Sequence, residues 1–264
     1  MNEQLFKTYI ESNDAFGGPQ YYKKIEFYPV KIKDGKYLEL FSKLMLYPKN
    51  WGADKQIFKT SYIKYMILSR GSSIEIENAQ REFENFLSYV SNKKVKIDLL
   101  RKDKKEITLE DFFVNLYFDD IEITEWEFEE IREIILEQNG YSIEYVNQFH
   151  PELEEMISKL RNKNSLSFAD QIFTMTVILH IPPIQLGEFT LLQLQNIFDK
   201  MITLKQFDLY QPLLTAGTIK LKTGEIKSYL YHNGKRGRYD EILIPTEEYI
   251  KKNNDIFGGK LGRK

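Results

Sequence analysis

SFADQIFTMTVILHIPPIQLGEFTLLQ, residues 167–193, is the stretch that decides the fold of this chain. Two motifs in it, Ser167-Phe168-Ala169-Asp170 and Thr190-Leu191-Leu192-Gln193, place a hydroxyl three residues ahead of an acceptor, the spacing of a helix capping box. Residues 171–179 are apolar on nearly every side. The second motif opens an apolar stripe at helical spacing, formed by Leu191, Leu194, Phe198 and Met201. The stretch predicts two consecutive capped helices, followed by a third short helix that closes in Ala216-Gly217.

The first 107 residues mix strand and helix patterns. Apolar residues alternate from Tyr22 to Lys33, which predicts a strand with Pro29 at an edge or bulge. Asp34-Gly35 then predicts a turn. Apolar residues at helical spacing follow in three segments, 37–45, 61–68 and 77–90. Residues 95–99 and 106–107 flank a basic segment and are expected to pair as a small hairpin.

Capping signals continue through the middle of the chain. Thr108 is expected to cap a short helix that runs through Leu116. Thr124-Glu125-Trp126-Glu127 has the capping-box spacing and predicts a helix that closes at Asn139-Gly140. Pro151 is expected at the first position of a further helix.

These patterns predict an α+β protein with a mainly helical body, a small β-containing N-terminal part and a C-terminal hairpin. The hairpin is expected around the turn Lys222-Thr223-Gly224-Glu225. The organisation that follows is a mixed α/β region (1–107), a helical region (108–217), and a hairpin with a basic tail (218–264).

Composition excludes several classes of protein. Of 264 residues, 42% are hydrophobic and 14% aromatic, which is typical of a folded chain. Because there is no cysteine, disulfides, thiolate metal sites and cysteine nucleophiles are excluded. No run approaches the roughly 18 apolar residues that a membrane span needs. The first ten residues also lack the apolar core of a secretory signal. We therefore expect a soluble, intracellular protein with no membrane partner.

Candidate catalytic groups fail on spacing or on context. The three histidines, His150, His180 and His232, have no zinc-site spacing, and the acidic run at 119–122 lacks the glycine of a calcium loop. We expect no enzyme, no cofactor and no metal. Two alternatives stay open: a metal-dependent nuclease that uses Glu225 and Lys227 with Asp208, or a nucleic-acid-binding protein that uses the basic loop 234–238. Nucleic acid is not expected as a partner.

Charge is unevenly distributed along the chain. Residues 106–155 hold 16 acidic residues and one basic residue, whereas the flanking segments are basic. Three glutamates at helical spacing, Glu129, Glu133 and Glu137, are expected to face outward together with Glu125. Like charges four residues apart disfavour a helix slightly, and a cost that the fold itself does not need indicates a role in binding. We therefore predict that Glu129, Glu133 and Glu137 form a surface for a basic partner. The alternative is that they are an ordinary solvated helix face.

About a third of the chain resembles tail assembly chaperones of phages and prophages of Gram-positive bacteria. The resembling segments are Ile25 to Asp34, the Ser-Phe-Ala-Asp helix start at 167–170, Ile181-Pro182-Pro183, residues 189–193 continuing into 198–201, and the close in Ala216-Gly217. The resemblance implies a tail assembly factor in the host cytoplasm. Its partner would be another tail protein, the tape measure or the tail tube. The segment after Gly217 exceeds the family's core, which leaves a structural component of the tail or neck as an alternative.

Overall fold

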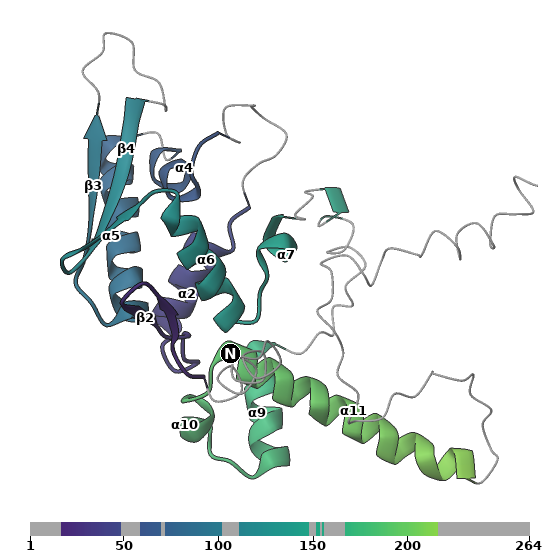
Figure 1. Ribbon diagram of the computed structural model, residues 1–264. Coiled ribbons are helices and arrows are strands. Elements are labelled where there is room, and N and C mark those ends of the chain that lie inside the picture. Colours follow the sequence, from purple (N-terminus) through teal and green to yellow (C-terminus); the bar gives the residue numbers. More distant parts are fainter. Residues whose placement is uncertain are drawn as a thin grey trace, which may run out of the picture.

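The computed structural model describes residues 17–48, 59–69, 72–101, 111–147, 152, 153, 155 and 167–215. Within them the chain is an α+β protein with a helical body and two antiparallel sheets (Figure 1). The strands are β1 (Gln20–Tyr22), β2 (Ile25–Phe27), β3 (Val95–Arg101), β4 (Phe112–Phe118) and β5 (Ile121–Thr124). The helices are α2 (Gly35–Met45), α4 (Tyr62–Leu68), α5 (Ser73–Ser91), α6 (Glu127–Gln138), α7 (Ile143–Asn147), α9 (Phe168–Leu179), α10 (Pro183–Leu186) and α11 (Leu191–Thr215).

The larger sheet has the order β3-β4-β5, with Val95 opposite Phe118 and Phe118 opposite Ile121. The expected helix from Thr108 through Leu116 is wrong, because residues 112–118 form β4. Apolar and aromatic residues alternate there, and the sheet buries one face of the strand. The partner of β3 is therefore β4, while residues 106–107 lie outside the described part of the chain. The region expected to be helical from residue 108 thus begins with two strands.

The continuous strand expected from Tyr22 to Lys33 is also wrong. The chain turns at Lys23-Lys24, so that β1 and β2 pair with each other, and the backbone φ of Lys23 is +52°. After Phe27 the chain leaves this small sheet. The amide of Val30 donates to the Asn139 side chain at 3.0 Å, at the end of α6. The segment after β2 is thus fixed by helices instead of by strands.

The main hydrophobic core packs the larger sheet and β2 against α2, α4, α5 and α6. Its largest fully buried rings include Phe27, Phe41, Phe83, Phe86, Phe118 and Phe128. Phe27 and Phe118 meet edge to face, with 5.7 Å between ring centroids. Buried residues of this core extend from Ile25 to Val146, on both sides of the boundary expected at 107/108.

A second, smaller core belongs to the helical unit formed by α9, α10 and α11. Met175, Leu186 and Leu194 are buried in it, together with Ile32 from the segment after β2. The short third helix expected before Gly217 is wrong. The helix that begins at Leu191 continues through Pro212, since residues 191–211 contain no glycine or proline to end it. The short helix of this unit is α10, which lies between the two long ones.

Helix caps agree well with the sequence patterns. Ser167 and Asp170 form a reciprocal capping box on α9, and Thr190 and Gln193 exchange two hydrogen bonds of the same kind at the start of α11. The Thr124 and Glu127 side chains pair in this way before α6. A capping box on α5, from Ser72 and Glu75, was missed by the sequence patterns. Of the helix expected from Pro151, the three residues that the structure describes, Glu152, Leu153 and Glu155, are helical, and the rest lies outside the described residues, as does the hairpin after Gly217.

Gly140 ends α6 in a conformation that a side chain disfavours. Its φ is +86°, and an added Cβ would lie 2.8 Å from the Gln195 side-chain oxygen. Gly140→Ala should therefore lower the free energy of unfolding by about 1–2 kcal/mol. Gly35→Ala is the matched control, since a Cβ at Gly35 meets no atom within 4 Å. Urea unfolding measures both variants, and equal stability of the two would contradict this account of Gly140.

Candidate functional site: the helical unit and its joint

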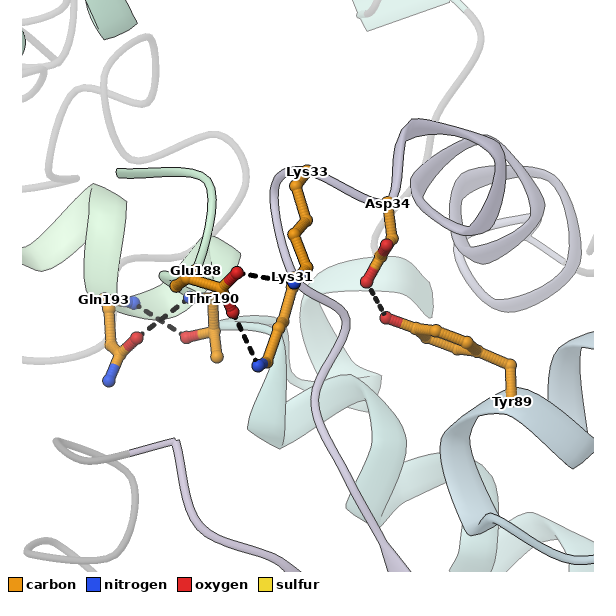
Figure 2. A network of polar contacts seen from close by, with 7 residues as sticks. All are labelled: Lys31, Lys33, Asp34, Tyr89, Glu188, Thr190 and Gln193. Atoms are coloured by element: carbon orange, nitrogen blue, oxygen red, sulfur yellow. Dashed lines mark hydrogen bonds and ion pairs between the residues drawn. The ribbon is translucent and has the colours of Figure 1, made fainter. Parts of the chain in front are cut away.

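The helical unit is attached to the rest of the protein through the segment after β2. Lys31 and Thr190 form an antiparallel bridge. The amide of Ile32 donates to the Phe189 carbonyl at 2.9 Å, and the amide of Lys33 donates to the Gly187 carbonyl at 2.9 Å. Figure 2 shows this joint, with Glu188 facing the two lysines. The helical unit is thus held to the body by backbone hydrogen bonds as well as by the shared Ile32.

One carboxylate strengthens the joint electrostatically. Glu188 accepts hydrogen bonds from Lys33 at 2.5 Å and Lys31 at 2.9 Å. These two ammonium groups, Lys33 first, lower the pKa of Glu188 from 4.5 to about 2. On the other side of the segment, the Tyr89 hydroxyl donates to Asp34 (Figure 2), and burial together with this bond raises the pKa of Tyr89.

The joint should therefore weaken in acid. Because the folded protein depresses the pKa of Glu188, its ionised form favours the folded state at every pH above 4.5, and this contribution disappears as the pH falls toward 2. The thermal midpoint of the wild type should fall more steeply over this range than that of Glu188→Gln. Differential scanning fluorimetry against pH measures both. Parallel curves would show that the Glu188 pair contributes nothing.

The helical unit exposes apolar side chains on several faces. On α9, Met175 is the one fully buried residue, although the helix is apolar nearly all round. Phe173 and Val177 are exposed on it, and Ile184 is exposed on α10. On α11, Ile202, Leu204 and Leu209 are 39%, 41% and 62% exposed. A helix as apolar all round as α9 is usually buried, so its exposed side chains are a candidate surface for binding another protein.

The acidic surface predicted on α6 is only partly present. Glu129 is half-buried, and its carboxylate accepts from the Tyr62 amide at 2.6 Å, at the start of α4. Glu125 also faces inward, where it accepts from the Val114 amide and pairs with Lys64. The expectation that these two glutamates face outward is therefore wrong. Glu133 and Glu137 are exposed, so two of the three glutamates predicted to bind a partner lie at the surface.

Three of the remaining candidate residues, Asp119, His180 and Asp208, lie in the part of the chain that the structure describes. Asp119 lies in the turn between β4 and β5, with φ +51°, and pairs with Lys93 at 2.8 Å. That pairing lowers the pKa of Asp119. Where the structure describes the chain, no group of three acidic or histidine side chains could hold a metal ion. His180 ends α9 and Asp208 is exposed on α11.

Other predicted groups are not described by the structure. They are His150, His232, Glu225, Lys227 and the loop 234–238.

The exposed faces of α9 and α11 are the features that sequence patterns missed. The apolar run at 171–179 is evident in the sequence, but nothing in it distinguishes a fully buried helix from a helix with an exposed apolar face.

Among the helices that the structure describes, none is both long enough and apolar enough to cross a bilayer. Comparison with protein-family models, with curated proteins and with solved structures gives no significant match.

Proposed function

We propose that this protein is a phage tail assembly factor that binds another tail protein, such as the tape measure, through the far half of α11. The observation that carries the proposal is the exposed apolar face formed by Ile202 and Leu209. An exposed apolar face is typical of a surface that binds another protein.

The geometry of α11 suits recognition by a groove. The helix has 25 residues and is therefore about 37 Å long. Its first half packs into the second core through Leu194, Phe198 and Met201. The far end of α11 extends away from the other labelled helices (Figure 1). Ile202 and Leu209 are seven residues apart, two helical turns, so they share one face. Helices that dock in apolar grooves use anchors at this spacing.

The sequence resemblance supports the same assignment. The segments that resemble tail assembly chaperones include both capped helix starts of the unit that carries the exposed face. A factor of this kind would act in the host cytoplasm during tail assembly and leave before the virion is complete. The exposed apolar side chains would then be covered by the partner for part of the assembly pathway.

A structural component of the tail or neck is the second candidate, because it would also need exposed apolar surface for its neighbours. Mass spectrometry of purified virions and of tail-assembly complexes separates the two. An assembly factor should co-purify with the tape-measure or tail-tube protein from producing cells and be absent from virions. Abundance in virions would favour the structural component. Absence from both samples would contradict both functions.

A further inference from the structure

We propose that the helical unit formed by α9, α10 and α11 opens from the folded body as one cooperative unit, and that the Ile32 side chain holds it closed. The body is the part of the protein around the main core. The inference concerns the protein without any partner, so it goes beyond the proposed function. It rests on the unequal size of the two cores, on the contacts at the joint, and on the way in which the body holds the docking segment, residues 31–33.

The two cores are separate and very unequal. Where the structure describes the chain, twenty-six buried hydrophobic residues form the main core and four form the second core, and none belongs to both. One of the four, Ile32, comes from the body, so the helical unit itself supplies Met175, Leu186 and Leu194. A unit of about 50 residues is marginal on its own even with a full core. The three helices therefore depend on Ile32 for their fold.

The described contacts at the joint bury little besides Ile32. The amides of Ile32 and Lys33 donate the two backbone hydrogen bonds that join the docking segment to the helical unit. The ion pairs of Glu188 are about half exposed, and pairs at such a surface contribute little to stability. Two further close approaches, of Gly17 and Gly140 to the start of α11, are made by residues without a side chain. The Ile32 side chain is thus the main apolar contact between the two parts.

The body holds the docking segment at both of its ends. On one side, Val30 is fully buried in the main core, and its amide donates to the Asn139 side chain at 3.0 Å. On the other side, Asp34 accepts from the Tyr89 hydroxyl (Figure 2), and α2 begins at the next residue. Neither anchor involves the helical unit. The docking segment therefore keeps its place when the unit opens, and the three helices are the part that moves.

Opening changes the surface that the protein offers. Met175, Leu186 and Leu194 are buried while the unit is docked, and opening adds them to the apolar side chains that α9 already exposes. A protein that binds the open unit shifts the equilibrium toward opening by mass action. Parts of a fold that move for binding are generally its least stable parts. The joint thus controls how much apolar surface is available.

The first test is hydrogen exchange of the full chain, measured by mass spectrometry under conditions in which the exchange rate reports the opening equilibrium. Interior amides of α9 and of the first half of α11 should exchange together, about 100-fold or more faster than those of α5 and β4. Equal protection of α9 and α5 would mean that the chain opens only as a whole and would overturn the proposal. Unprotected amides in α9 would overturn it as well, because the docked state would then not be the populated one.

Ile32→Ala and Val30→Ala test the role of Ile32 as a matched pair, because both remove buried methyl groups from the same stretch of chain but from different cores. Ile32→Ala should speed exchange in α9 by about 30-fold or more and leave α5 unchanged. Val30→Ala should speed exchange in α5 by about 10-fold or more and leave α9 unchanged, because α9 opens while the body stays folded. Equal acceleration of both helices by Ile32→Ala would contradict the proposal.

Thiol labelling gives an independent measurement. The chain has no cysteine, so Leu194→Cys and Leu87→Cys each place a single buried thiol, one in the second core and one in the main core. The thiol in Leu194→Cys should react with an added reagent about 10-fold or more faster than the thiol in Leu87→Cys, since it is exposed whenever the unit opens. Adding Ile32→Ala should speed the first reaction and leave the second unchanged. Equal labelling rates for the two thiols would contradict the proposal.

Discussion

Replacing Arg132 with alanine should lower the free energy of unfolding by about 3 kcal/mol or more. Arg132 is only 2% exposed, and its guanidinium lies 3.5 Å from the ring centroid of Tyr62. One of its nitrogens donates to the Met45 carbonyl at 3.0 Å, at the end of α2. Alanine would leave that buried carbonyl without this donor and would leave a cavity under the Tyr62 ring.

Burial lowers the pKa of Arg132, and the nearby Tyr62 and Glu129 counter only part of this effect. Burying the guanidinium therefore costs electrostatic free energy, which its contacts with the Tyr62 ring and the Met45 carbonyl offset. Arg81→Ala is the control, because Arg81 is exposed on α5 and its removal should change stability by about 0.5 kcal/mol at most. Urea unfolding of the wild type, Arg132→Ala and Arg81→Ala measures the three free energies of unfolding. A loss below about 1 kcal/mol for Arg132→Ala would mean that neither the stacking nor the hydrogen bond stabilises the core.

The double change Ile202→Asp with Leu209→Asp should weaken binding to the proposed tail partner by about 100-fold or more. Both side chains lie on the face of α11 that we propose as the anchor, and burying a charge there is unfavourable. Leu204→Asp is a closely matched control. Leu204 is as exposed as Ile202, but two residues along the helix place it on a different face. Similar losses for the control and the double variant would contradict the assignment of the face.

Local signals in the sequence predicted much of the helical unit. The capping pairs Ser167 with Asp170 and Thr190 with Gln193 need only residues three positions apart, so their spacing alone predicts where α9 and α11 begin. β4 was different. Its strand conformation depends on pairing with β3, and a plausible cap at Thr108 made the same residues look helical.

Contacts distant in the sequence explain the errors on α6. Glu129 lies on a helix whose own pattern places it near the outward glutamates. Its carboxylate instead accepts from the Tyr62 amide, 67 residues earlier in the chain. In the same way, the apolar run of α9 predicted a helix correctly but could not show which side of that helix packs into the second core. Both features depend on the packing of elements that no local pattern relates.

The most direct test of the proposed function is calorimetric titration of the purified protein with purified tape-measure and tail-tube proteins of the same phage or prophage. We predict saturable binding to one of them. The affinity should be lost in the Ile202→Asp, Leu209→Asp double variant and kept in Leu204→Asp. Absence of binding to both proteins, or equal affinity of the double variant and the wild type, would contradict the proposal that α11 docks a tail protein.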